Sequence, residues 1–417
     1  MKGIWKNNII LFLSTLLFFG CSGTLRLNEF DLSKNYQVNG LIYQIDFSLT
    51  SLNDSISSAN VQINPNDLLF SKTQSGNYIA RYSIGYKIFE GYNDKEPIDT
   101  ATIHYSMQQI KKPKQKLHNI NFVAPIGKNY IVKISLIDEN RNFTTSKIKI
   151  LRKKNTKDRS YFKICSLKKS SNNRTLYQKD SFSLTPPSNF KQKIKVMTFS
   201  YKTTCTAKPY EVTHSHRIAT IPDSTWMISN ETHYSFPPLK NGYYHFVTDT
   251  QNQEGFSVFS MPSSFPKISS LKYANGALGY LLDKADYANL LRNKNPKTSF
   301  ENEWLKLAGN RNRAKNLIKA YYTEVSTANK LFTNNQPGWT TDRGMIYIIY
   351  GPPKIVYRYE NSEIWIYGEE NNLLSEEFEF QKIHSNISDH IYELKRNVNF
   401  KISFNRMVKF WIEERGY

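Results

Sequence analysis

The stretch PGWTTDRGMIYIIYGPP, residues 337–353, decides the fold of the C-terminal part of this chain. Gly338 follows a helix-stopping proline, and glycine allows backbone angles that other residues avoid. Trp339 offers a large rigid apolar anchor, and the side chain of Thr341 or Asp342 can accept hydrogen bonds from nearby backbone amides. The stretch therefore predicts a tight turn that directs the chain from a helix into a sheet.

The apolar run after this turn is expected to form a central strand. Met345 to Tyr350 is apolar on both faces, and Gly351, Pro352 and Pro353 end the run because proline cannot continue a ladder of hydrogen bonds. Three more strands are predicted downstream, at Ile355 to Tyr359, Ile364 to Tyr367 and Phe378 to Gln381. Before the turn, from about Leu271, the apolar residues recur at helical spacing, which predicts a helical hairpin packed on a small antiparallel sheet.

This C-terminal part resembles the GWxTD domain family. The family signature of glycine, tryptophan, any residue, threonine and aspartate is matched at Gly338 to Asp342, and it leads through Arg343 and a glycine to Gly-Pro-Pro, as in the family. The resemblance extends over roughly residues 271–417. It implies no established activity.

Two interpretations of the motif are open. In the structural one, Trp339 fills a core and the charges of Asp342 and Arg343 pair or cap around the turn. In the functional one, the turn lines a groove in which Arg343 grips an anionic group and Asp342 positions it. We favour the structural interpretation, because turn chemistry alone accounts for every residue.

The N-terminal part shows the two-residue alternation of half-buried strands. Leu41, Tyr43, Ile45, Phe47 and Leu49 share one face, and similar runs recur throughout the first 265 residues. This pattern predicts two tandem immunoglobulin-like β-sandwiches. The expected fold class is therefore multidomain β plus α+β.

Composition shifts divide the chain. A charged polar break at residues 152–159 separates the two sandwiches. The predicted segments are a signal peptide at 1–20, a tether at 21–38, a first sandwich at 39–154, a second at 155–266 and the GWxTD domain at 267–417.

The start of the chain predicts a lipoprotein. A basic beginning and an apolar run from Ile9 to Phe19 form a signal peptide, too short to span a membrane. The segment Leu17 to Cys21 resembles a lipobox, in which Cys21 becomes the first mature residue and carries lipid. An ordinary secretory signal is the alternative. We expect an outer-membrane lipoprotein that faces the periplasm, anchored by this lipid alone.

The net charge of +21 is concentrated in the N-terminal part. Residues 266–417 hold 22 Lys and Arg against 17 Asp and Glu, a net +5, which leaves +16 for residues 1–265. Such a field favours anionic glycans, lipid headgroups or acidic proteins. Nucleic acid is not expected as a partner of an envelope protein, and a solvated basic surface without a ligand is the simpler interpretation.

Other chemistry is sparse in the sequence. Cys165 and Cys205 could form one disulfide or remain unpaired. The histidines at 214, 216, 233 and 245 form a weak pattern for a metal site, so neither a metal nor another cofactor is predicted. No phosphate loop, nucleophile elbow or zinc-binding helix is recognisable, so no catalytic residue is assigned.

These observations predict a non-enzymatic envelope lipoprotein that binds an envelope protein partner through its GWxTD domain. A glycan-binding protein with an aromatic platform at Trp226, Tyr243 and Tyr244 is one alternative. An envelope hydrolase with an open cleft around Asp342 is another.

Overall fold

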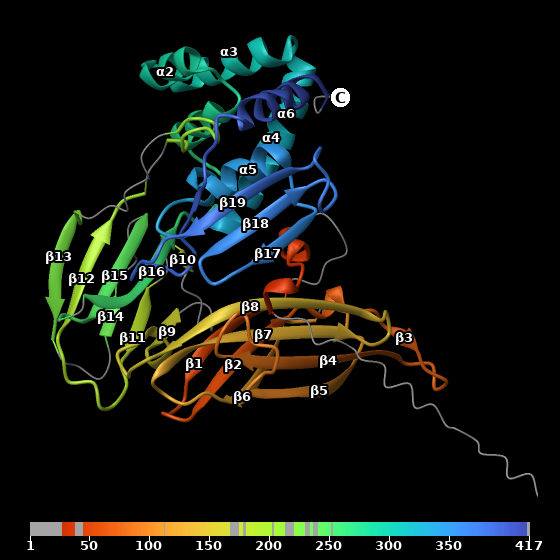
Figure 1. Ribbon diagram of the computed structural model, residues 1–417, viewed down its shortest axis with the longest axis vertical. Helices are drawn as coiled ribbons and strands as arrows, with labels where there is room; N and C mark the ends of the chain where they lie inside the picture. Colours follow the sequence, from red (N-terminus) through yellow and green to blue (C-terminus); the bar gives the residue numbers. More distant parts are fainter. Residues whose placement is uncertain are drawn as a thin grey trace, which may run out of the picture.

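The computed structural model describes residues 27–37, 45–111, 113–166, 175–177, 181–201, 204–212, 221–229, 234–236, 241–251 and 253–414. Cys21 and the signal peptide lie outside the described residues. The described chain forms two β modules followed by an α+β module, and the three meet near the centre of Figure 1. The expected fold class is confirmed.

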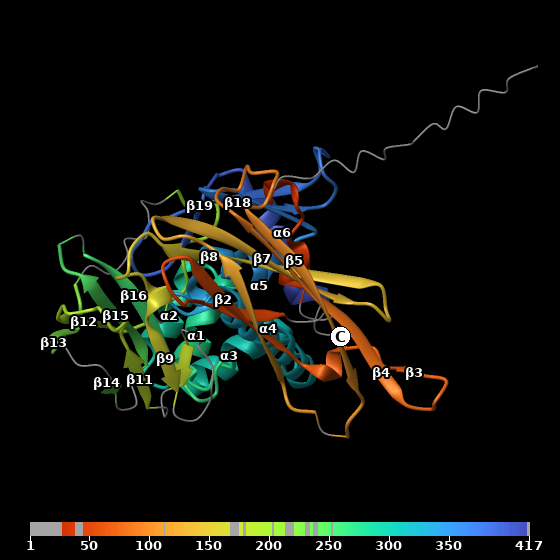
Figure 2. The same cartoon turned by 90° about the horizontal axis from the view of Figure 1, so that it is seen from below.

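The first β module is a sandwich of two sheets around one apolar core (Figure 2). One sheet has the order β1-β2-β6, with strands Asp46–Ser51, Ile56–Ile63 and Lys116–Val123. The other has the order β3-β4-β7-β8, with β5 paired to β4, and its strands are Ser71–Lys72, Tyr78–Phe89, Lys128–Asp138, Phe143–Lys153 and Asp99–Gln108. Alternate residues of β4 and β7 enter the shared core, as their period predicts.

The second β module also has two sheets that share a core. Its larger sheet has the order β10-β16-β15-β12-β13, with strands Thr175–Tyr177, Glu254–Met261, Gly242–Asp249, Ile194–Phe199 and Ser224–Ile228. Its smaller sheet has the order β14-β11-β9, with strands Tyr234–Phe236, Phe182–Thr185 and Lys163–Ser166. The pairs are antiparallel except for the parallel pair β10 and β16.

The third module places helices beside a four-stranded antiparallel sheet. The helices are α1 Leu271–Ala277, α2 Lys284–Arg292, α3 Pro296–Ala308, α4 Arg311–Phe332, α5 Asp342–Tyr350 and α6 Phe400–Glu414. The sheet order is β17-β18-β19-β20, with strands Ile355–Arg358, Ser362–Tyr367, Glu376–Lys382 and Tyr392–Leu394. α3 and α4 form the expected hairpin, in which Gly309 ends α3 at φ +79° and Asn310 caps α4.

The predicted central strand Met345 to Tyr350 is wrong, because these residues belong to α5. Helix α5 is buried on nearly every side, so its sequence lacks the polar stripe that marks an amphipathic helix. A short apolar run of this kind is consistent with either a buried strand or a buried helix. The three strands predicted after it are confirmed as β17, β18 and β19.

Residues 27–36 differ from the tether expected at 21–38. They form two short 3-10 turns, η1 Leu27–Glu29 and η2 Ser33–Tyr36, and Leu27, Leu32 and Tyr36 are buried in the core of the third module. That core also includes Phe89 and Ile131, whose strands belong to the first sandwich. The N-terminal segment therefore fills the interface between the first and third modules.

Candidate functional site

The motif forms a 3-10 turn, η6 Gly338–Thr340, that leads directly into α5 and packs on α4. Both glycines of this region permit close backbone contact. A Cβ atom on Gly338 would lie 2.0 Å from the Ala328 carbonyl oxygen, and one on Gly344 would lie 1.9 Å from the Gly338 carbonyl oxygen. Any larger residue would therefore push η6 away from one of the two helices.

Thr341 fixes the start of α5. Its hydroxyl donates to the Gly338 carbonyl oxygen at 2.7 Å and accepts from the Gly344 backbone N–H at 2.9 Å, so it is the N-cap residue. Gly351 ends the helix with φ +83°, a value that favours glycine. Pro352, which is exposed, and Pro353, which is buried, then lead into β17.

Trp339 is fully buried between α4 and the segment after α1. Its backbone N–H donates to Asn329 Oδ1 at 3.2 Å, and its carbonyl oxygen accepts from the Tyr280 hydroxyl at 2.7 Å. The ring of Tyr273 meets the indole edge-on, with centroids 6.4 Å apart. The tryptophan thus joins three helical segments, as its proposed core role requires.

Asp342 has four donors around its carboxylate. Oδ1 accepts from Arg396 Nη2 at 2.6 Å and from the Thr206 hydroxyl at 2.7 Å. Oδ2 accepts from Arg396 Nη1 at 3.0 Å and from the Leu394 backbone N–H at 2.8 Å. This two-pronged ion pair ties the start of α5 to the end of β20 and to the second module.

Arg343 belongs to a second buried charge cluster, centred on Glu363 of β18. Glu363 Oε1 lies 3.3 Å from Arg343 Nη1 and accepts from Trp365 Nε1 at 2.8 Å, and Oε2 accepts from Arg358 Nε at 2.7 Å. The guanidinium of Arg343 also lies over the Tyr392 ring, 4.2 Å from its centroid. Burial raises the pKa of Glu363, but Arg358 and Arg343 lower it more, and the net pKa is about 2.

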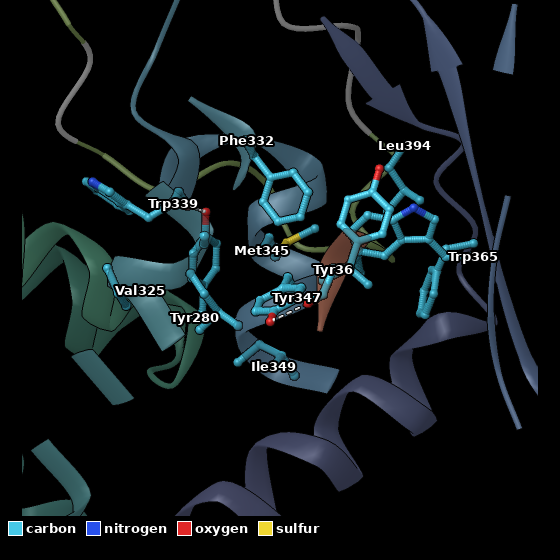
Figure 3. Packing of buried hydrophobic residues seen from close by; sticks show 14 of the residues in the cluster. Tyr36, Tyr280, Val325, Phe332, Trp339, Met345, Tyr347, Ile349, Trp365 and Leu394 are labelled. Atoms are coloured by element: carbon cyan, nitrogen blue, oxygen red, sulfur yellow. Dashed lines mark hydrogen bonds between the residues drawn. The ribbon is translucent and has the colours of Figure 1, made fainter. Parts of the chain in front are cut away.

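Tyr36 brings the N-terminal segment into this cluster. Its hydroxyl donates to Glu363 Oε1 at 2.8 Å and accepts from Arg358 Nη2 at 3.0 Å. Its carbonyl oxygen accepts from the Tyr347 hydroxyl of α5 at 2.9 Å, the bond drawn in Figure 3. The ring lies against Phe332 and Trp365. Residues before the first sandwich therefore complete a core that the third module shares with Phe89 and Ile131 of the first sandwich.

The arrangement favours the structural interpretation of the motif. Asp342 and Arg343 are 4% and 5% exposed, and both have charged partners within the chain. A carboxylate with four donors is poorly placed to accept a proton from a substrate. The partners Arg396, Glu363 and Tyr36 were not recognised from the sequence, where no local spacing connects them with the motif.

Among the remaining candidate residues, Cys205 lies beside the motif, because it directly precedes Thr206, whose hydroxyl donates to Asp342 Oδ1. Cys165 in β9 and Cys205 near α2 are both free thiols. His245 is buried and bonds the Ser257 hydroxyl at 3.0 Å, whereas the histidines at 214, 216 and 233 lie outside the described residues. Among described residues, no group of three or more His, Cys, Asp and Glu side chains converges as metal ligands would.

The aromatic platform expected for glycan binding is not formed. Tyr243 and Tyr244 are buried in the second module, and the partly exposed Trp226 packs edge-on against Tyr244 with centroids 6.5 Å apart. Within the described part of the chain, no helix combines the length and apolar character needed to cross a bilayer.

Comparison with known proteins identifies one family. The sequence model of the GWxTD domain matches residues 242–413, which begin at β15, earlier than the predicted boundary at 267. No curated protein matches. Among solved structures, the beta-glucuronidase of Parabacteroides merdae is 13% identical with a TM-score of 0.17, and the match covers 26% of this chain and only 13% of the enzyme. That similarity is too low to carry an argument about function.

Proposed function

We propose, from the premise that this chain is a GWxTD domain-containing protein, that it acts as a non-enzymatic binding or assembly module of the cell envelope. The observation that carries this proposal is the internal pairing of the motif charges. Asp342 is held by Arg396 and Arg343 by Glu363, so the motif supports the core while the surfaces around it are left for binding. In this proposal the chain is lipidated at Cys21, anchored in the outer membrane and faces the periplasm.

The same pairing argues against the hydrolase alternative. A catalytic Asp342 would need an open cleft and a vacant lone pair near the substrate. Its two oxygens instead accept from Arg396, Thr206 and the Leu394 backbone. The glycan-binding alternative loses its expected platform, because Tyr243 and Tyr244 are core residues.

Several contacts between modules suit a binding scaffold. Arg152 of β8 donates to Asp389 of the third module at 2.8 Å, and Thr206 of the second module reaches Asp342. A body joined in this way presents its surfaces in a fixed relation to each other, which lowers the entropy lost when a partner binds. The proposed partner is an envelope protein.

Two measurements test this proposal. Mass spectrometry of the mature protein should find Cys21 as an acylated N-terminus, and Cys21→Ser should release the protein from membranes.

Cross-linking of the native protein in membranes should recover one partner in stoichiometric amount, and Arg396→Gln should weaken this recovery only in proportion to the loss of folded protein. A mature protein without fatty acid, or a substrate turned over by wild type but not by well-folded Asp342→Asn, would overturn the proposal.

A further inference from the structure

The turn between β18 and β19 exposes two adjacent leucines. Leu373 and Leu374 are 102% and 93% exposed, although leucine is among the residue types most often buried. Hydrogen bonds within the turn fix its shape. The Ser375 hydroxyl donates to the Glu369 carbonyl oxygen at 2.8 Å and accepts from the Glu369 backbone N–H at 2.8 Å. The Leu374 backbone N–H donates to Asn372 Oδ1 at 2.9 Å. The leucines are therefore displayed on a preformed turn, which loses little entropy when it docks.

Carboxylates surround these leucines. Four glutamates lie within four positions of them, three exposed and the third in sequence partly exposed: Glu369, Glu370, Glu376 and Glu377. No Lys or Arg occurs in the sequence between Arg358 and Lys382. Residues 369–377 form what we term the acidic tip. Such a tip complements a surface that is apolar at its centre and basic at its border.

A surface of that kind lies at one end of the first sandwich. Tyr78 at the start of β4 is 47% exposed, and Ile110, which follows β5, is 61% exposed. The two are neighbours, because the Gln109 backbone N–H donates to the Tyr78 carbonyl oxygen at 3.0 Å. Exposed Leu69 lies beside β4, because Asn140 Nδ2 donates to its carbonyl oxygen. The same Nδ2 also donates to a carbonyl oxygen of β4.

Lysines border this apolar surface. Four of them are exposed: Lys72, Lys111, Lys114 and Lys116. Lys72 pairs with Tyr78 in the register of β3 and β4, and Lys111 directly follows Ile110. Of two carboxylates near Leu69, Asp138 is buried and Asp67 accepts from the Asn64 amide at 3.1 Å. The four lysines outnumber these acids, and we term this surface, with Leu69, Tyr78 and Ile110 at its centre, the basic end.

The charges of both surfaces are uncompensated in an isolated copy. Within the residues that the structure describes, none of the four tip carboxylates and none of the four lysines forms a salt bridge. Both views of the molecule show β3 projecting from the first sandwich, away from β18 and β19 (Figures 1 and 2). The tip and the basic end of one chain therefore do not meet, and a second copy offers each of them its complement.

We propose that copies of this chain associate head to tail, with the acidic tip of one copy docked on the basic end of the next. Leu373 and Leu374 then cover Tyr78 and Ile110, and the glutamates meet the lysines. Because the two surfaces differ, each contact leaves a free tip and a free basic end, so association continues into chains or closes into a ring. This inference goes beyond the proposed function, because it needs neither the lipid nor a different partner.

Sedimentation velocity of the chain from residue 21 onward measures this association, with Cys21→Ser so that no acyl chain drives it. The sedimentation coefficient should rise with protein concentration beyond the value of a dimer. Raising sodium chloride from about 0.05 M to about 0.5 M should weaken the association at least about tenfold, because salt screens exposed charges.

A pair of leucine variants tests the apolar part of the contact. Leu373→Ser with Leu374→Ser should weaken the association at least about tenfold, because two apolar side chains no longer leave water. The matched control, Val398→Ser with Ile402→Ser, removes two exposed apolar side chains beside and on α6 and should leave the association unchanged.

Charge reversal tests which surfaces meet. Glu369→Lys with Glu370→Lys makes the tip basic, and Lys111→Glu with Lys114→Glu makes the basic end acidic. Each variant alone should stay monomeric, because its two surfaces then carry the same sign. An equimolar mixture of the two should associate, because each variant supplies the sign that the other lacks.

A control separates this effect from a change of net charge. Lys297→Glu with Lys319→Glu makes the same charge change at exposed positions of α3 and α4, and this variant should associate like the wild type. Circular dichroism checks that every variant is folded.

Three results would overturn the inference: a wild type that stays monomeric up to about 100 µM, a leucine variant that associates as well as the wild type, or a mixture of the charge-reversed variants that stays monomeric. A lipid surface is the rival occupant of the tip, although its carboxylates would be repelled by anionic headgroups. A monomeric wild type that floats with phosphatidylethanolamine vesicles, and loses this binding with Leu373→Ser and Leu374→Ser, would assign the tip to lipid instead. Acylation of Cys21 and recovery of a different partner test the proposed function separately.

Discussion

Replacing Glu363 by glutamine should cost about 3 to 5 kcal/mol of stability, the usual penalty for removing one partner of a buried ion pair. Glu363 has no exposed side-chain surface, and Arg343 and Arg358 beside it are 6% and 13% exposed. The amide of glutamine is uncharged and turns an N–H donor toward one of these guanidinium groups. Two buried cations would then lack their counter-charge, and this loss dominates the effect.

Urea unfolding followed by tryptophan fluorescence measures this loss. Four tryptophans, Trp304, Trp339, Trp365 and Trp411, are fully buried in the third module, so the signal reports mainly on that module. The matched control is Glu379→Gln in the same sheet, whose carboxylate pairs with the exposed Lys395 at 3.1 Å. Such exposed pairs contribute at most about 1 kcal/mol.

Tyr36→Phe extends the test to the N-terminal segment. The change removes one of the donors to Glu363 and one acceptor of Arg358 but keeps the ring in place. We expect the free energy of unfolding to fall by about 1 to 2 kcal/mol.

The comparison of Glu363→Gln with Glu379→Gln decides the main prediction. If Glu363→Gln is no less stable than Glu379→Gln, the cluster does not support the core and the reasoning about the motif is refuted.

Three further predictions concern pH, backbone contact and thiols. The pKa of Glu363 is lowered from 4.5 to about 2, so its ionised form stabilises the fold fully above pH 4.5, and this stabilisation is lost as the pH falls toward 2. The free energy of unfolding of the wild type, measured with urea, should therefore fall by about 3 kcal/mol over that range. The same measurement on Glu363→Gln should depend less on pH. Gly338→Ala should lower the denaturation midpoint more than Gly309→Ala, because a Cβ at Gly338 meets the Ala328 carbonyl oxygen at 2.0 Å. At Gly309 nothing lies within 4 Å, and alanine there meets only the strain of φ +79°, about 1 to 2 kcal/mol. Equal midpoints would contradict the close packing of η6 on α4. The exposed thiol of Cys165 should react with a thiol reagent well before that of Cys205, because burial raises the pKa of Cys205. If neither thiol reacts until a reductant is added, the two cysteines form a disulfide instead.

The regular β elements could be predicted from the sequence because each has one buried face. In β4 and β7, alternate residues such as Tyr82, Ile84, Val132 and Ile134 enter the sandwich core, and that period is readable along the chain. Strands β17, β18 and β19 follow the same rule. Helix α5 could not be assigned in this way, because Met345 to Ile349 are buried on all sides and burial on all sides removes the period.

The contacts of the candidate site could be predicted only in part. The local role of Thr341 could be predicted because its bonds reach residues three positions away, and the core position of Trp339 could be predicted from its size and apolar character, although its partners are distant in sequence. The ion-pair partners of the motif could not be found, because Glu363 comes from β18 and Arg396 from the segment after β20, and the positions of both depend on the complete fold. For the same reason, the three buried apolar side chains of residues 27–36, Leu27, Leu32 and Tyr36, show no periodic pattern in the sequence, because they lie on one irregular segment.

The position of that segment changes what an anchor at Cys21 would do. Leu27 is buried and lies six positions after Cys21, and six residues of extended chain reach at most about 20 Å. A lipid on Cys21 would therefore hold the interface between the first and third modules close to the bilayer. Such an anchor would restrict the orientation of the whole molecule, because the short segment that follows Cys21 in the sequence ends at Tyr36, inside the charge cluster that supports the motif.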